Sequence, residues 1–217
     1  MAVMDVGHTL KDSARGHENT ASVVKGDTRR QPFAPGRIGS SLRIGGPKAG
    51  GYAQISSGLE LPTTEFTIMA WIRTETLPRN AVLVSDMNLA GNETLRFGLV
   101  GDHGNLGLTL DNGMRTLQIV DSTPLPLEDW THVAVVKTAE ELRLYRNGAL
   151  VSCQPFDVFH AQPHNPLSIG GIPKESGVKK RRHRSGFWHG RIDELAFFGS
   201  ALTSQQIENL FQFTPSI

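Results

Sequence analysis

Short segments in which every second residue is apolar recur along this chain, and glycine, proline or asparagine separates them. In residues 66–73 the alternate apolar positions are Phe66, Ile68, Ala70 and Ile72. A two-residue period indicates a strand with one buried face, because successive side chains of a strand point to opposite sides. Asn147–Gly148 between two such segments is typical of a tight hairpin, whose central residues need positive φ. About ten such segments at roughly 8–12-residue spacing predict an antiparallel sandwich or barrel.

One segment near the end of the chain has the period of a helix instead. Thr203 and Gln206 have the spacing of a capping box, and Ile207, Leu210 and Phe211 follow at helical spacing. This pattern predicts a short amphipathic helix over residues 203–211. Residues 1–40 are more polar, so we expect an irregular N-terminal arm, with the sandwich over 41–200. The chain is therefore predicted to be one all-β domain over residues 1–217.

The composition narrows the kinds of partner and site. The formal net charge is +1, so the chain as a whole has no electrostatic preference for nucleic acid, which we do not expect as a partner. Cys153 is the single cysteine, which excludes an intrachain disulfide and a multi-cysteine zinc site. No apolar run approaches the ~20 residues of a membrane-spanning helix. The first residues also lack the pattern of a signal peptide.

Seven blocks of sequence follow one another in a recognisable order. They are residues 12–19 (Asp-Ser-Ala-Arg-Gly-His-Glu-Asn), 36–42 (Gly-Arg-Ile-Gly-Ser-Ser-Leu), 66–72 (Phe-Thr-Ile-Met-Ala-Trp-Ile), 130–134 (Trp-Thr-His-Val-Ala), 144–148 (Leu-Tyr-Arg-Asn-Gly), 190–194 (Gly-Arg-Ile-Asp-Glu) and 201–207 (Ala-Leu-Thr-Ser-Gln-Gln-Ile). Together these blocks resemble the laminin-G-like branch of the concanavalin A-like jelly rolls. Arg15 and Gln205–Gln206 depart from the family pattern, which has a glycine and an acidic pair there.

The resemblance implies an antiparallel two-sheet jelly-roll sandwich. It also implies a structural calcium ion (Ca2+), as in many members, between the N-terminal arm and the acidic residue of the Ile-Asp-Glu strand. The corresponding residues here are Asp12, Asn19 and Asp193. The alternative is that Asp193 accepts backbone N–H groups from a neighbouring turn.

Glycoside hydrolysis needs two carboxylates that face one cleft. On one strand these would be two residues apart, whereas Glu140–Glu141 and Asp193–Glu194 are adjacent pairs that point to opposite faces. No Gly-x-Ser-x-Gly nucleophile elbow is present either. We therefore do not expect an enzyme, although carboxylates from separate strands keep a polysaccharide-acting enzyme open as an alternative.

A dense basic run precedes the last strand. Between residues 174 and 191 there are seven Lys or Arg residues and one Glu, and the core of the run is Lys179, Lys180, Arg181, Arg182 and Arg184. Clustered cations attract sulfate and phosphate groups, and salt weakens that attraction. The run is a candidate site for a sulfated or acidic polysaccharide; the simpler interpretation is a solvated hairpin tip.

Sugar binding needs exposed aromatic rings and short polar side chains. Trp71 and Trp130 fall within strands and are expected in the core, whereas Trp188 and Tyr52 are the better candidates for exposure. The loops that contain Asn88, Asn92 and His103 could line one rim of the sandwich.

From the residues and the resemblance we expect a non-catalytic binding module, lectin-like or of the adhesion type. It would recognise a glycan or a partner protein, with calcium as a possible support, and belong to a larger extracellular or cell-surface protein. The alternative is a structural or protein-interaction domain without glycan affinity.

Overall fold

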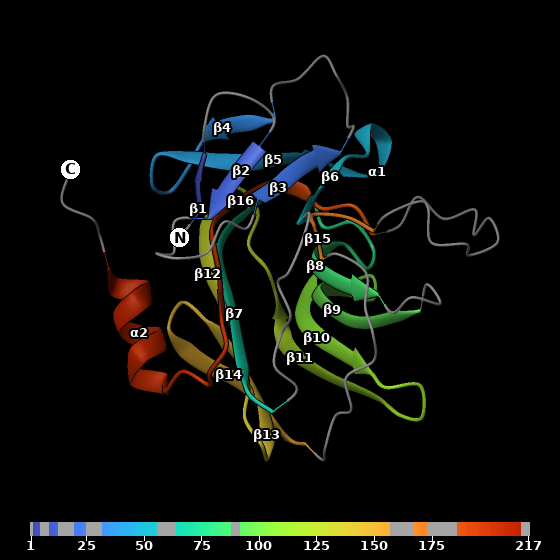
Figure 1. Ribbon diagram of the computed structural model, residues 1–217, viewed down its shortest axis with the longest axis vertical. Coiled ribbons are helices and arrows are strands. Elements are labelled where there is room, and N and C mark those ends of the chain that lie inside the picture. Colours follow the sequence, from blue (N-terminus) through green and yellow to red (C-terminus); the bar gives the residue numbers. More distant parts are fainter. Residues whose placement is uncertain are drawn as a thin grey trace.

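The computed structural model describes residues 2–4, 9–12, 20–24, 32–55, 64–87, 92–156, 167–172 and 186–213. Its strands form two antiparallel sheets packed face to face (Figure 1). The predicted all-β sandwich is therefore confirmed.

The first sheet has nine strands, and we call it sheet A. In spatial order they are β1 (Ala2–Met4), β2 (Thr9–Asp12), β3 (Thr20–Val24), β6 (Tyr52–Ile55), β15 (Ser168–Ile169), β8 (Val82–Met87), β9 (Glu93–Val100), β10 (Asn105–Asp111) and β11 (Thr116–Pro124).

The second sheet has seven strands, and we call it sheet B. In spatial order they are β14 (Ala149–Pro155), β13 (Glu141–Arg146), β12 (Trp130–Lys137), β7 (Phe66–Thr74), β16 (His189–Phe198), β5 (Ser40–Gly45) and β4 (Phe33–Pro35). The single helical turn α1 (Gly46–Ala49) follows β5, and α2 (Ser204–Gln212) follows β16.

The main core lies between the two sheets and is built from the alternate apolar residues of the strands. Ile68, Ala70 and Ile72 of β7 face Phe97 and Leu99 of β9 in this core, and all are at most 1 % exposed. This is the face that the two-residue period of residues 66–73 predicts. The other residues of each strand point to the outer faces of the two sheets.

Helix α2 covers one part of the outer face of sheet B (Figure 1). Ile207 packs there against Met69, Ala134 and Tyr145 in a second apolar cluster. Thr203 caps the helix by the reciprocal capping box with Gln206, as the sequence predicts. Strand β7 is buried on both faces because this helix lies over a sheet face that would otherwise be solvated.

The N-terminal arm differs from the prediction. Residues 1–40 were expected to be irregular, but β1, β2 and β3 extend sheet A and β4 extends sheet B. These strands are short and lie toward sheet edges, where polar residues are tolerated because one side faces water. A polar composition therefore did not exclude strand formation.

Asn147 and Gly148 form the predicted turn between β13 and β14, with φ of 49° and 78°. Cys153 on β14 is exposed. Its thiol donates to Glu141, and this bond raises the pKa of the thiol. Among the described residues, no helix is long and apolar enough to cross a membrane.

Candidate functional site

A row of polar residues crosses the outer face of sheet A. The strand register aligns them across six neighbouring strands, in the order Gln54, Ser168, Ser85, Arg96, Thr109 and Gln118. The inward-facing neighbours of Arg96 and Thr109, such as Phe97 and Leu108, lie in the core, which places the row on the outside. We call these six residues the polar row. Ser22 of β3 and Thr9 of β2 continue it at the same register.

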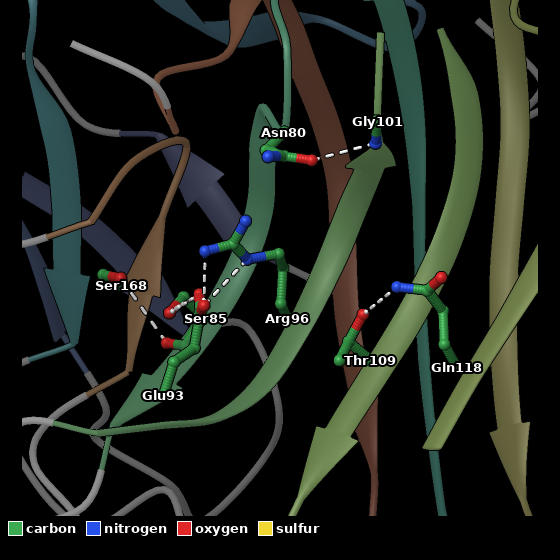
Figure 2. A network of polar contacts seen from close by, with 8 residues as sticks. All are labelled: Asn80, Ser85, Glu93, Arg96, Gly101, Thr109, Gln118 and Ser168. Carbon is green, nitrogen blue, oxygen red and sulfur yellow. Dashed lines mark hydrogen bonds and ion pairs between the residues drawn. The ribbon is translucent and has the colours of Figure 1, made fainter. Parts of the chain in front are cut away.

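The accessible part of the row lies over β9, β10 and β11. The side chain of Arg96 is 24 % exposed, Thr109 is half-buried and Gln118 is exposed. The Gln118 Nε2 donates to the Thr109 hydroxyl at 3.0 Å, which fixes the two side chains side by side (Figure 2). Ser85 and Ser168 belong to the row but are each only 1 % exposed, so a ligand could not reach them in this structure.

Arg96 is held in one orientation by Glu93. The Arg96 Nε donates to Glu93 Oε2 at 2.8 Å, the Arg96 Nη2 makes a second contact with the same oxygen, and Ser85 donates to Oε1 at 3.0 Å (Figure 2). Residues three apart on a regular strand point to opposite faces, but the pairing of β8 with β9 shifts between Asp86 and Met87. This irregularity brings Glu93 to the same face as Arg96.

The next row along the same face contains two glycines. Val82, Gly98, Gly107 and Val120 are aligned across β8 to β11. A Cβ at Gly98 would lie 2.2 Å from the Ala81 carbonyl oxygen, and one at Gly107 would lie 2.6 Å from that of Ile119. At both glycines the backbone of a neighbouring strand therefore occupies the space that a side chain would need. These two positions lie next to Arg96 and Thr109 on the same strands. The turn at the end of this row is fixed by Gly101, whose N–H donates to Asn80 Oδ1 at 2.8 Å (Figure 2).

The predicted sugar-contacting residues do not form one site. Trp188 is fully buried in the core, so its expected exposure is wrong. Tyr52 is half-buried and lies two residues before Gln54 on β6, which places it on the same outer face as the polar row. Asn92 precedes β9 and His103 follows it, so these exposed residues lie at opposite ends of a strand and cannot share one rim. Asn88 lies outside the described residues.

The two other tryptophans differ from each other. Trp71 is 6 % exposed, as expected for a core residue, but it lies on the outer face of sheet B beneath Phe211 of α2. Trp130 is only half-buried at the start of β12, so it is not a core residue.

Asp193 accepts backbone N–H groups, as the alternative to calcium binding predicts. Its Oδ2 accepts the N–H of Ile38 at 2.9 Å, and its Oδ1 accepts that of Glu194 at 3.0 Å. Both carboxylate oxygens are therefore used by backbone donors. The part of the chain that the structure describes contains no group of three or more His, Cys, Asp or Glu placed to hold a metal ion. Asn19 lies outside the described residues and Asp12 is described by its backbone alone, so calcium binding stays a prediction.

The basic run, Lys179 to Arg184, also lies outside the described residues, but both ends of its loop are placed. A Cβ on Gly186 would lie 3.0 Å from the Ile172 Cδ1, and one on Gly171 would lie 2.7 Å from a ring carbon of Phe187 and 3.1 Å from the Cβ of Tyr52. The loop therefore leaves and re-enters the sandwich at one point beside Tyr52. The Val82 N–H donates to the carbonyl of Gly186 at 3.1 Å, which ties this point to β8.

Sequence reasoning missed Arg96, Thr109 and Gln118. Each is a single polar residue in the outward phase of an alternating strand, which is the ordinary pattern of a solvated face. Alternation could have assigned these residues to the outer face. Only the register between strands shows that they are aligned.

The family of this chain follows from its sequence as well as its fold. The family model described as concanavalin A-like lectin/glucanases superfamily matches residues 47–208, which includes most of both sheets and the start of α2. This chain belongs to that superfamily. The laminin-G-like, concanavalin A-like resemblance of the seven sequence blocks is thereby confirmed. The sequence has no significant match among curated proteins.

Solved structures of similar fold include one domain of an arabinanase and the binding domains of two botulinum neurotoxins. Domain 4 of an extracellular GH43 arabinanase from Geobacillus stearothermophilus, in complex with arabinotriose, has a TM-score of 0.67 at 19 % identity, and 88 % of each chain is covered. The binding domain of botulinum neurotoxin serotype C1 has a TM-score of 0.71 at 16 % identity, with 97 % of this chain and 51 % of that chain covered. The binding domain of botulinum neurotoxin DC in complex with SialylT has a TM-score of 0.68 at 14 % identity, with 93 % and 48 % covered. This chain spans about half the length of the two toxin domains, and at these identities the likeness shows the fold alone.

Proposed function

We propose that this chain is a non-catalytic glycan-binding module, and that the polar row on the outer face of sheet A contacts the sugar hydroxyls. The observation that carries the proposal is the alignment of Arg96, Thr109 and Gln118 on three neighbouring strands. Adjacent strands lie about 4.8 Å apart, so the row offers polar groups at regular intervals to an extended ligand.

The chemistry of the row suits hydroxyl groups, which both donate and accept hydrogen bonds. The amide of Gln118 and the hydroxyl of Thr109 can each do both, whereas Arg96 only donates. Arg96 is already oriented by Glu93, and Gln118 by Thr109, so little side-chain entropy remains to be lost on binding.

The names of similar structures support a glycan as the kind of ligand. One is a complex with arabinotriose, another is a complex with SialylT, and a third report concerns botulinum neurotoxin type C and two ganglioside molecules. These ligands differ from one another, so the comparisons support no particular sugar. We further propose that the chain acts outside the cell as part of a larger protein, in keeping with the extracellular arabinanase among its neighbours.

The hydrogen bonds of Glu93, the carboxylate beside the polar row, support a non-catalytic role. Glu93 accepts from Arg96 on one oxygen and from Ser85 on the other. A glycosidase needs one carboxyl group that gives up a proton and a second that faces the same bond. Glu93 is committed to orienting Arg96 instead.

An array of neutral and acidic glycans tests the proposal, with wild-type protein and two double variants. Thr109→Ala/Gln118→Ala removes the exposed end of the polar row. Gln205→Ala/Gln212→Ala removes two exposed amides from α2 and serves as the control, since their bonds stay within that helix. At about 1 kcal/mol for each lost hydrogen bond, we expect the first variant to lose about tenfold or more in affinity. A blank array would instead favour a structural or protein-interaction domain, and equal binding by both variants would place the site elsewhere.

A further inference from the structure

Three arginines from three neighbouring strands lie side by side on the outer face of sheet B. In the register of this sheet, Arg43 of β5 is paired with Arg191 of β16, and Arg191 is paired with Arg73 of β7. Trp130 of β12 is paired with Arg73 and continues the line. The flanking residues Leu42, Ile72 and Ile192 point into the core, which places the arginines on the outside. We call Arg43, Arg191 and Arg73 the arginine row.

This arrangement is unfavourable for an isolated sheet, because like charges directly opposite one another on neighbouring strands repel. Two carboxylates offset part of the repulsion. Glu75 lies 3.7 Å from the Arg43 guanidinium, and Glu128 lies 2.5 Å from that of Arg73. Arg191 makes no ion pair with the residues that the structure describes. Within the described part of the chain, its Nη1 donates to the carbonyl oxygen of Pro35 at 3.0 Å, and its buried Nε has no hydrogen-bond partner.

The arginine row lies outside the area that α2 covers. Helix α2 packs over Met69 and Ala134, and its Phe211 reaches the next pair of residues, Trp71 and His132. The row is two residues further along the same strands. There the side chains of Arg43 and Arg73 are 30 % and 24 % exposed.

A fourth guanidinium lies beside the row. Arg37 is exposed, and its guanidinium carbon lies 4.9 Å from the ring centre of Trp71, in the adjacent row of residues. The loop that carries Arg37 is fixed by the bond from the Ile38 N–H to Asp193. Positive charge from four separate segments therefore gathers on one part of this face, with the half-buried ring of Trp130 at its end.

We propose that the arginine row is a second binding site, which holds the sulfate or carboxylate groups of an acidic polysaccharide. Guanidinium groups pair with such oxyanions through two parallel N–H donors, and their spacing of about 4.8 Å per strand suits a chain with repeated negative groups. Trp130 favours a saccharide, because an aromatic face packs against the apolar face of a sugar ring. The choice of a saccharide rests on the proposed function, but the site lies on the opposite sheet and has its own test.

The test measures affinity for dextran sulfate, polygalacturonate, unsulfated dextran and a single-stranded oligonucleotide. Three variants are compared with the wild type, each in the natural chain and in one whose Lys179–Arg184 run is replaced by serine. Arg43→Gln/Arg191→Gln removes two charges from the row. Arg79→Gln/Arg115→Gln removes two exposed charges elsewhere and is the charge-matched control. Glu128→Gln removes the carboxylate that pairs with Arg73.

We expect the row variant to lose at least about tenfold in affinity for dextran sulfate and polygalacturonate, with a weaker dependence on salt, while the control stays within about twofold. Glu128→Gln should bind about two- to threefold more tightly, which loss of fold could not produce. Equal losses in the row variant and the control would overturn the site. Tighter, row-dependent binding of the oligonucleotide would overturn the choice of a polysaccharide. The polar-row variant Thr109→Ala/Gln118→Ala should keep its affinity for dextran sulfate, so failure of one site is distinguishable from failure of the other.

Discussion

The carboxylate of Asp193 accepts the backbone N–H of Ile38 at 2.9 Å, although 155 residues separate them in the sequence. The bond fastens the turn between β4 and β5 to the middle of β16. Asp193 is 4 % exposed, and burial raises the pKa of its carboxyl group while the backbone donors act in the opposite direction. The contact explains why a charged residue can lie inside this strand, and it leads to two predictions.

Gly36→Ala should destabilise the protein because of this contact. A Cβ on Gly36 would lie 2.4 Å from Asp193 Oδ2, well inside contact distance. We expect a loss of about 1–3 kcal/mol in the free energy of unfolding, measured in urea. In the double variant Gly36→Ala/Asp193→Ala the clash is absent, so the two single effects should not add. Strict additivity would contradict the contact.

Calcium binding by Asp12, Asn19 and Asp193 has a thermal test. If these residues hold calcium, a chelator should lower the melting temperature, and Asp193→Ala should abolish that effect. Without a metal ion, burial raises the pKa of the Asp193 carboxyl group in the folded state. The folded protein therefore binds a proton at Asp193 more readily than the unfolded chain does. The group's contribution to stability then falls as the pH rises above 3.8 through the folded-state pKa. A melting temperature that does not change on addition of the chelator would rule the metal site out.

His132 should make the fold sensitive to acid. The ring is fully buried between Trp71 and Phe211, and burial lowers its pKa from 6.5 to about 4. The unfolded chain therefore takes up this proton first as the pH falls, and stability is lost between about pH 6.5 and pH 4. The full effect is about 3 kcal/mol, at 1.36 kcal/mol for each pKa unit. His132→Phe keeps a ring in place, so its unfolding free energy should vary less over this range; two parallel pH profiles would disprove the assignment.

The basic run gives a prediction that rests on its charge. Replacing Lys179–Arg184 by serine should reduce retention on heparin at low salt, and the difference from wild type should shrink as salt rises. The control is Arg79→Gln/Arg115→Gln, which removes exposed charges elsewhere. If the serine variant is retained as strongly as the wild type, heparin binds to other cations. The arginine row would then be tested first.

Local signals in the sequence predicted the local structure correctly. The Asn147–Gly148 hairpin and the Thr203 capping box each depend on a few consecutive residues, and both are present. The alternation in residues 66–73 identified the core face of β7 for the same reason. The order of the seven blocks then identified the superfamily.

Features that depend on register or on distant contacts were not predictable in this way. Trp188 was expected to be exposed, yet it is fully buried within the sandwich. The ring of His132 packs against the rings of Trp71 and Phe211, and neither of its nitrogens has a hydrogen-bond partner among the described residues. The polar row and the arginine row could not be found from the sequence. Arg96, Thr109 and Gln118, like Arg43, Arg191 and Arg73, become neighbours only when their strands pair.

The central claim is that the outer face of sheet A binds glycans, and mapping a bound glycan by NMR tests it most directly. The strongest neutral ligand from the array would be titrated into isotope-labelled protein, and the backbone and side-chain amide shifts followed. We predict that the largest changes lie at Arg96, Thr109 and Gln118 and at the adjacent Gly98 and Gly107, with the Gln118 side-chain amide among them. Changes confined to sheet B, or to the Gly101–Gly104 turn and the other loops, would contradict the account.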